Sequence, residues 1–225
     1  PKHADATDPE PTMASDQTRP GALTLAIESS NPSSGGRPGV ALGITAPDAC
    51  ETLGIERLGT GERHDDLLMP AIDRLFAGLG RSPNELDRIA VSAGPGGYTG
   101  LRIATSAATL IALATGSVVV AVPSAAVVSR RVRTEGVHAG PLVVCLASKH
   151  DSAWVTRFAA NGPAGDPGAR KTADRLDLRP DENEAVVGDR FLPETFLQAA
   201  ARAGRPVIEP VCEPEACLGL AWSVP

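Results

Sequence analysis

The sequence predicts an α/β protein with two lobes, and three observations support this fold class. Strand-like and helix-like segments alternate along the 225 residues. The order strand, hairpin, helix, strand, helix occurs once clearly and again, more weakly, in the second half. A glycine-rich turn joins a buried strand to an almost uncharged helix within residues 92–115. We expect an extension at 1–20, a first lobe at 21–123 and an incomplete second lobe at 124–225.

The chain begins with a stretch rich in Pro, Asp and Thr, which predicts disorder over residues 1–20. Met13 fits a translation start, which would make residues 1–12 read-through or a tag. Three strands with short links then predict a meander, at 23–27, at 40–44 and within 50–58. Glu28 ends the first strand, where a carboxylate suits phosphate or metal chemistry. A solvated or ion-paired Glu28 is the alternative that we favour, because one carboxylate is a thin basis for a metal site.

A helix is predicted at residues 65–79 because its apolar side chains share one face. These are Leu68, Ile72, Leu75, Phe76 and Leu79. Asp65 or Asp66 is expected to cap its start, and Gly78 and Gly80 to end it. His64 stands at that start without a second histidine nearby, so we expect a contact or cap rather than a metal ligand.

The glycine turn follows a predicted strand at 88–93 and leads into a helix at 99–115, with Thr99 as the expected N-cap. A turn of this kind can present backbone N–H groups to an anion. The residues that would contact phosphate or a nucleotide are Gly94, Gly96, Gly97, Thr99 and Gly100. The turn lacks the lysine of a P-loop and the third glycine of a dinucleotide fingerprint. A tight turn without a ligand is an equally good interpretation.

The helix at 99–115 carries Arg102, and no charged residue follows until Arg130. A helix with small or apolar side chains all round is buried on more than one side. One side is expected to lie on the sheet, and the other to meet a second helix or a partner protein. A membrane span is the rival interpretation, but residues 115–117 interrupt the run before it is long enough.

The remaining elements follow more weakly. The pattern predicts strands at 118–122, 142–147, 153–159, 185–189 and 206–208, and helices at 124–129 and 191–203. Arg130, Arg131 and Arg133 are expected to form the solvated end of the first of these helices. Residues 161–168 resemble a Pro/Gly loop, and 171–184 a polar, mobile stretch.

Composition excludes several classes of function. The net charge of −6 and the 3% of aromatic residues disfavour a protein that binds nucleic acid by itself. The four cysteines form no CxxC pair, so we expect free thiols in a reducing cytosol rather than a zinc site or disulfide framework. No signal peptide is visible, and 42% hydrophobic with 21% charged residues is ordinary globular composition.

Three segments together resemble one family: LAIESS, ERHDDLLMPAIDRL and above all AGPGGYTGLRIA. They are similar to the bacterial TsaB (YeaZ) proteins of the tRNA threonylcarbamoyladenosine machinery, over about residues 22–150. The resemblance implies the actin/Hsp70/hexokinase-like (ASKHA) fold, two ribonuclease-H-like lobes, in a glycoprotease-like superfamily. It also implies a non-catalytic cytoplasmic subunit that binds and activates TsaD, which modifies adenosine next to the anticodon of tRNAs reading ANN codons.

The family pairs through its first two helices, which would place the partner interface at nine residues here. They are His64, Leu67, Leu68, Ala71, Leu101, Arg102, Thr105, Ala108 and Thr109. The resemblance further implies a TsaD heterodimer joined by TsaE, a homodimer when alone, contact with tRNA only through the complex, and no membrane. No cofactor is expected on this chain alone, with ATP or ADP at the shared complex interface.

The sequence departs from the family at several points. Glu28 stands where the family usually has Asp, and Ser148 where it often has Asp. A pair of carboxylates that would face each other across the cleft between the two lobes is therefore lost or weakened in this chain. The catalytic relative has a His-x-x-x-His metal pair, whereas the four histidines here form none, so we assign no catalytic or metal-binding residue. Two alternatives stay open: an ATP-dependent phosphotransferase or ATPase using the interlobe cleft, and a glycoprotease.

Overall fold

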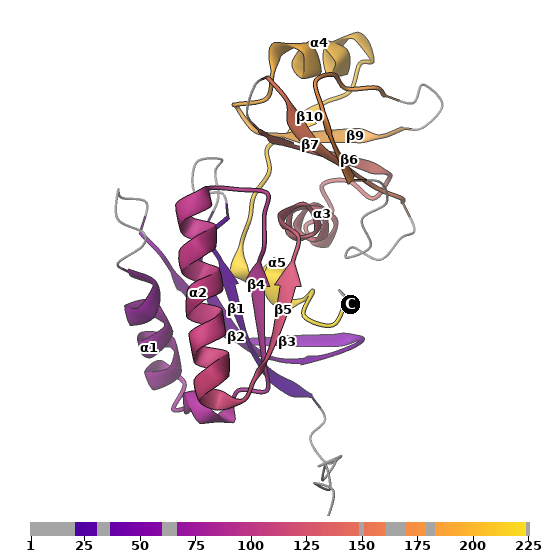
Figure 1. Cartoon of the computed structure of the whole chain (residues 1–225). Coiled ribbons are helices and arrows are strands. Elements are labelled where there is room, and N and C mark those ends of the chain that lie inside the picture. Colours follow the sequence, from indigo (N-terminus) through magenta and orange to yellow (C-terminus); the bar gives the residue numbers. More distant parts are fainter. Residues whose placement is uncertain are drawn as a thin grey trace, which may run out of the picture.

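The computed structural model describes residues 21–30, 37–59, 67–148, 151–160, 170–178 and 183–223. Two five-stranded sheets lie one above the other in Figure 1, each with its own helices. The predicted extension at 1–20, His64 and the caps Asp65 and Asp66 lie outside the described residues. Within the described part, no helix is long and apolar enough to cross a membrane.

The first sheet has the strand order β3-β2-β1-β4-β5. Its strands are β1 (Ala22–Glu28), β2 (Gly39–Ala46), β3 (Ala49–Arg57), β4 (Arg88–Ser92) and β5 (Val118–Val122). The pairs β1–β2 and β2–β3 are antiparallel, as the predicted meander requires, whereas β4 joins β1 and β5 joins β4 in parallel. Helices α1 (Leu68–Gly78) and α2 (Tyr98–Thr115) cover one face of this sheet (Figure 1).

The second sheet repeats that plan in the order β10-β9-β6-β7-β8. Its strands are β6 (Leu142–Ala147), β7 (Ala153–Phe158), β8 (Arg170–Ala173), β9 (Ala185–Gly188) and β10 (Val207–Ile208). Strand β6 again has an antiparallel hairpin on one side and parallel strands on the other. The repeat predicted from the sequence is therefore confirmed. Helix α4 (Glu194–Arg202) covers its outer face (Figure 1).

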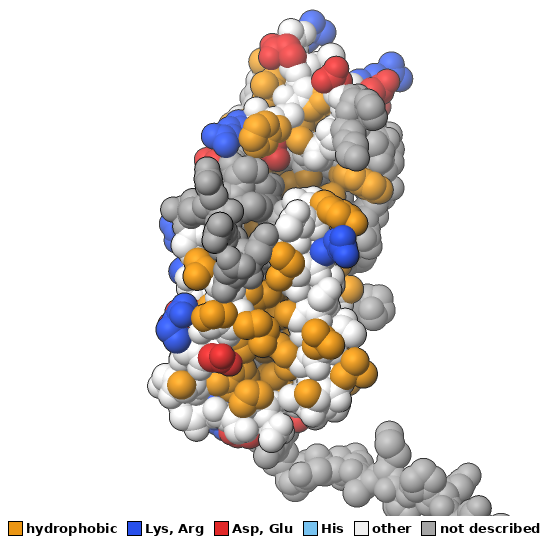
Figure 2. Space-filling model, turned by 60° about the vertical axis from the view of Figure 1, so that its left-hand side comes forward, with side chains coloured by type: hydrophobic (Ala, Val, Ile, Leu, Met, Phe, Trp, Pro, Cys, Tyr) orange, Lys and Arg blue, Asp and Glu red, His pale blue; other side chains and the backbone are white. Residues whose placement is uncertain are grey.

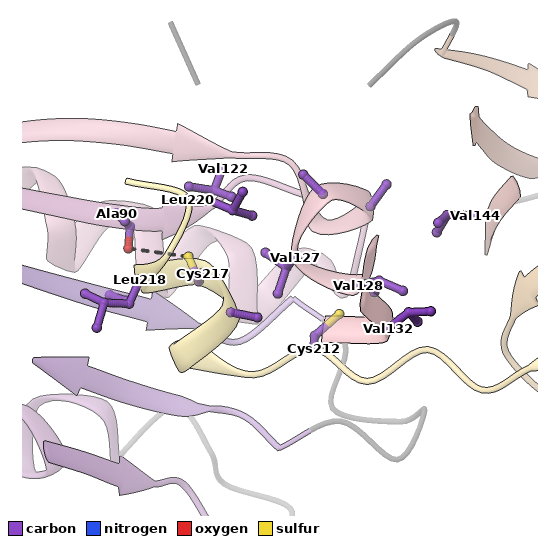
Figure 3. Packing of buried hydrophobic residues seen from close by; sticks show 14 of the residues in the cluster. Ala90, Val122, Val127, Val128, Val132, Val144, Cys212, Cys217, Leu218 and Leu220 are labelled. Carbon is purple, nitrogen blue, oxygen red and sulfur yellow. Dashed lines mark hydrogen bonds between the residues drawn. The ribbon is translucent and has the colours of Figure 1, made fainter. Parts of the chain in front are cut away.

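A hydrophobic core between the sheets joins the two lobes. Helix α3 (Ser124–Thr134) and helix α5 (Pro214–Leu218) supply much of it, and Figure 3 shows Val127, Val128, Cys217 and Leu218 in this cluster. The Sγ of Cys217 donates to the carbonyl of Ala90 in β4 over 3.8 Å. The chain thus returns to the first lobe after completing the second sheet. The predicted boundary at 123/124 lies between the two sheets, but the hydrophobic core between them contains residues from both sides of it.

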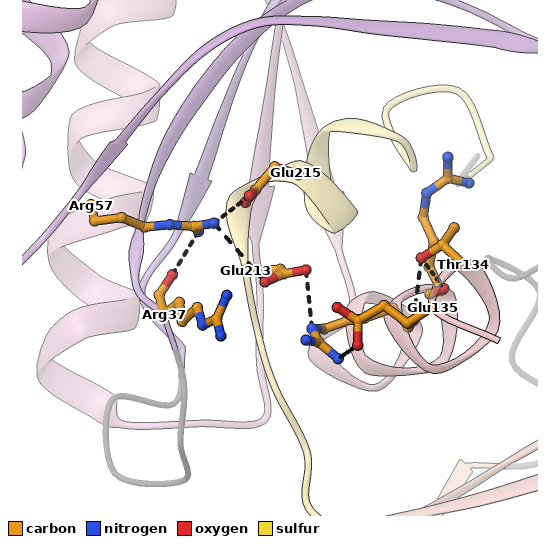
Figure 4. Close-up of polar contacts among 8 residues, drawn as sticks. Arg37, Arg57, Thr134, Glu135, Glu213 and Glu215 are labelled. Atoms are coloured by element: carbon orange, nitrogen blue, oxygen red, sulfur yellow. Dashed lines mark hydrogen bonds and ion pairs between the residues drawn. The ribbon is translucent and has the colours of Figure 1, made fainter. Parts of the chain in front are cut away.

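Polar contacts fix this returning segment at both of its ends. The guanidinium of Arg57 in β3 pairs with Glu215, and the Nε of Arg131 in α3 lies 3.0 Å from Glu213 (Figure 4). Further along, the Nε1 of Trp222 donates to Thr45 over 2.9 Å, and the guanidinium carbon of Arg88 lies 3.8 Å from the centre of the Trp222 ring. The segment after β10 is therefore part of the first lobe's structure.

Several elements differ from the sequence prediction. Strand β8 and helix α5 were not predicted, nor was the short 3-10 helix η2 (Pro83–Glu85) with its Ser82/Glu85 capping box. Helix α3 continues to Thr134 through its arginines. These do not form the solvated end that the sequence predicted, because Arg131 pairs with Glu213 and Arg133 donates to the carbonyl of Ala160. Thr99 is not the N-cap of α2; Gly97 takes that position and the helix begins at Tyr98.

Candidate functional site

An open apolar groove runs between α1 and α2. It has a volume of about 450 Å³ and is lined by Met69, Tyr98, Thr99, Arg102, Ile103, Ser106, Ala107 and Leu110. Several large apolar side chains on these helices face solvent, with exposed fractions of 47% for Met69, 66% for Leu110 and 78% for Leu113. Figure 2 shows hydrophobic side chains gathered over these two helices with few charges among them. This patch makes the groove the candidate site for binding a partner.

The structure places the predicted interface residues differently from the prediction. Leu68, Ala71 and Ala108 are at most 2% exposed and belong to the core of the first lobe, so they cannot contact a partner. Thr105 and Thr109 lie on the other flank of α2, where their hydroxyls donate to the carbonyls of Leu101 and Thr105 within the helix. Leu67 is 40% exposed but does not line the groove.

Arg102 is the predicted interface residue that lines the groove. The groove side of α2 instead presents Ile103, Ser106, Ala107 and Leu110, which recur at three- and four-residue spacing and therefore share one stripe of the helix. The predicted interface residues of α2 and the residues that line the groove therefore lie mostly on neighbouring stripes of the helix.

The glycine turn is packed directly against the end of β1. A Cβ at Gly96 would lie 2.1 Å from the carbonyl oxygen of Ser30, and one at Gly100 would lie 2.6 Å from that of Ser29. The N–H of Gly97 donates to the Ser30 carbonyl over 2.6 Å, and Gly94 has a φ of 93° that disfavours a side chain. Close backbone contact accounts for glycine at 96 and 100 without any ligand, and the N–H of Gly97 is already in use.

Glu28 is buried beneath this contact, with none of its surface exposed. Its Oε1 accepts hydrogen bonds from the backbone N–H and the hydroxyl of Ser30, over 2.7 and 2.6 Å. Its Oε2 has no partner among the described residues. The nearby Ser92 hydroxyl also lowers the pKa of Glu28, and it shares a 3.0 Å hydrogen bond with Ser124. Burial dominates these effects and raises the pKa of Glu28 above its ordinary value of 4.5.

Glu28→Gln should flatten the pH dependence of stability. Because the folded state binds the Glu28 proton more tightly than the unfolded chain does, the free energy of unfolding should fall as pH rises through the raised pKa. Glutamine keeps the acceptor for Ser30 and cannot ionise, so this decrease should disappear. Urea unfolding at several pH values between 4 and 8 measures it, with the exposed Glu194→Gln as control. Equal slopes for Glu28→Gln and the parent chain would contradict this assignment.

A second, smaller cavity of about 240 Å³ opens between the lobes. Its lining residues are Pro95, Gly96, Gly97, Leu146, Ala147, Asp189 and Phe191. Asp189 is the acidic residue of this lining, and its Oδ1 accepts the N–H of Phe191 over 2.9 Å. Ser148, where a family carboxylate was expected, is exposed and its N–H donates to the carbonyl of Ser152. Glu28 does not line the cavity, so the described residues place no pair of carboxylates across it from the two lobes.

Within the described ranges, no three His, Cys, Asp or Glu side chains lie close enough to hold a metal ion together. The thiols of Cys145, Cys212 and Cys217 are buried, and burial is the main cause that raises their pKa values, to about 12 for Cys145. These thiols are therefore poor nucleophiles.

Comparison with known proteins places these features in context. The family model described as TsaD, tRNA N6-adenosine threonylcarbamoyltransferase, matches residues 54–185. The solved structure of YeaZ from Pseudomonas aeruginosa has a TM-score of 0.65 and 19% identity, covering 89% of this chain and 90% of that chain. A second solved structure, an uncharacterized protein similar to peptidase YEAZ from the same organism, also has a TM-score of 0.65 and 19% identity, covering 90% and 92%.

A search of curated proteins gave no match. The structural likeness confirms the expected ASKHA fold, because it extends over nearly all of both chains.

Proposed function

The chain belongs to the TsaD family, as a YeaZ-like member, and we propose on that premise that it is an accessory subunit that binds a TsaD-type threonylcarbamoyltransferase. The observation that carries this proposal is the groove between α1 and α2. It is open and mostly apolar, and exposed leucines lie along α2. A partner helix that inserts apolar side chains there would bury Met69 and Leu110 and remove an unfavourable exposed surface.

The rest of the assignment follows the family. We propose a role in forming threonylcarbamoyladenosine next to the anticodon, with activation of TsaD as the contribution of this chain. TsaE would join the complex, ATP or ADP would bind at a shared interface, and tRNA would be contacted through the complex. The same groove would hold a second copy when TsaD is absent, and the complex would act in the cytoplasm.

The geometry gives less support to an independent phosphotransferase. The cavity between the lobes is smaller than the 300–1,000 Å³ typical of ligand sites. Glu28, the carboxylate that such an enzyme would use, is fully buried and bonded to Ser30.

Leu110→Asp should abolish the complex with TsaD and leave the fold intact. Leu110 is 66% exposed in the free chain, so the carboxylate stays solvated there, but the complex would bury it without a partner charge. We expect affinity to fall by about 100-fold or more. Sedimentation velocity of the chain alone and mixed with the TsaD of its own source measures both states.

Val137→Asp supplies the matched control. Val137 is also an exposed apolar residue, at 51%, but it follows α3 and does not line the groove. This variant should bind TsaD as the parent chain does. If Leu110→Asp forms the complex as readily as Val137→Asp, the groove is not the partner site and the proposal fails.

A further inference from the structure

Two exposed aromatic side chains flank the glycine turn, one on each lobe. Tyr98 opens α2 directly after the turn and is 73% exposed, and Phe191 follows β9 in the second lobe and is 55% exposed. Each is accompanied by an arginine. The guanidinium carbon of Arg102 lies 5.5 Å from the Tyr98 ring centre, and that of Arg190 lies 4.9 Å from the Phe191 ring centre. Each lobe therefore presents an exposed aromatic ring with an arginine beside it.

The glycine turn connects the two hollows beside it into one surface. Tyr98 and Thr99 line the groove between α1 and α2, whereas Pro95, Gly96 and Gly97 line the cavity between the lobes, whose opposite wall includes Phe191. Consecutive residues thus border both hollows. A partner seated in the groove can extend over the turn and reach the second lobe without leaving the surface of this chain.

The charges along this path favour an acidic occupant. Arg102 and Arg190 are both exposed, and neither has an acidic partner within 4.0 Å in the part of the chain that the structure describes. The acidic residue nearby, Asp189, is only 6% exposed and accepts the Phe191 N–H. Arginine and aromatic residues are also the types that dominate binding energy at protein interfaces.

We propose that the docking surface continues from the groove across the glycine turn to the second lobe, where an acidic segment of the partner protein binds between Arg102 and Arg190. Tyr98 and Phe191 contact the apolar parts of that segment, and the arginines pair with its carboxylates. This inference rests on the proposed function, because the segment belongs to the same TsaD-type partner. It adds a second-lobe contact to the helix pairing.

Arg190→Glu and Phe191→Ala test this contact, since both residues lie outside the helices of the groove. We expect Arg190→Glu to weaken TsaD binding about tenfold at low salt, with a smaller effect at high salt, because charge repulsion is screened. Phe191→Ala should weaken binding about tenfold at both salt concentrations. Arg202→Glu is the control, with the same charge change on an exposed residue of α4. It should leave affinity within about twofold.

Photocrosslinking identifies the occupant. A benzoylphenylalanine in place of Phe191 should crosslink to a TsaD peptide that carries Asp or Glu. A crosslinked peptide without acidic residues would overturn the acidic assignment.

If Arg190→Glu and Phe191→Ala bind like Arg202→Glu while Leu110→Asp abolishes binding, the surface ends at the helices and only this inference fails. If Leu110→Asp binds normally, the proposed function fails as well.

Discussion

Ala108→Asp is expected to leave no folded protein at 25 °C. Ala108 has no exposed surface and belongs to the core cluster beneath α2, where its neighbours in the cluster include Ile89 and Ala104. A carboxylate there would be desolvated with no partner charge, which costs several kcal/mol. That cost is comparable to the whole stability of a typical domain, roughly 5–15 kcal/mol. Far-UV circular dichroism and the thermal transition measure the loss.

Thr109→Asp is the matched control, because it introduces the same carboxylate one residue further along the helix. Thr109 is exposed, so the carboxylate remains in water and the melting temperature should change little. If Ala108→Asp folded and melted like Thr109→Asp, the side of α2 at Ala108 would face a partner rather than the core. The burial of Ala108 described above would then be incorrect.

Gly96→Ala should destabilise the chain by roughly 2–4 kcal/mol and weaken TsaD binding. The new Cβ would stand 2.1 Å from the Ser30 oxygen and 2.7 Å from its carbonyl carbon, and neither can move as a flexible side chain would. The turn must shift, which breaks the Gly97 N–H bond to Ser30 and displaces the start of α2, where Tyr98 lines the groove. Chemical denaturation and binding titration measure the two effects.

Gly78→Ala controls for the general effect of adding a methyl group. Gly78 ends α1, and a Cβ there would meet nothing within 4 Å. Alanine should therefore raise stability by roughly 0.5–1 kcal/mol through a smaller entropy loss on folding. If Gly96→Ala behaved like Gly78→Ala, the close contact with Ser30 would not be what holds the turn.

The elements that the sequence predicted well are those with a clear local pattern. The apolar face of α1, the short apolar runs of β1, β4 and β6, and the almost uncharged α2 are each visible within one segment. Helix α5 escaped prediction because it has only five residues, and its apolar character reflects burial against distant strands rather than a local period. Strand β8 lies in a polar stretch and forms only because β7 offers it a hydrogen-bonding edge.

The site was harder to predict than the fold. Both flanks of α2 carry small or apolar residues, so composition does not distinguish the stripe of Thr105 and Thr109 from that of Ser106 and Leu110. Only the position of α1 decides which stripe borders a groove. In the same way, the need for glycine at 96 comes from the Ser30 carbonyl, a group 66 residues earlier in the chain, and no local pattern reveals that approach.

The return of α5 to the first lobe has a consequence for synthesis on the ribosome. Strands β1 to β5 emerge from the exit tunnel first, yet the face of their sheet that α5 covers stays open until residues 214–218 have been made. The nascent chain therefore carries a sheet with one uncovered apolar face through the translation of the whole second lobe. Chaperones that hold nascent chains should bind it during that interval and release it once α5 docks.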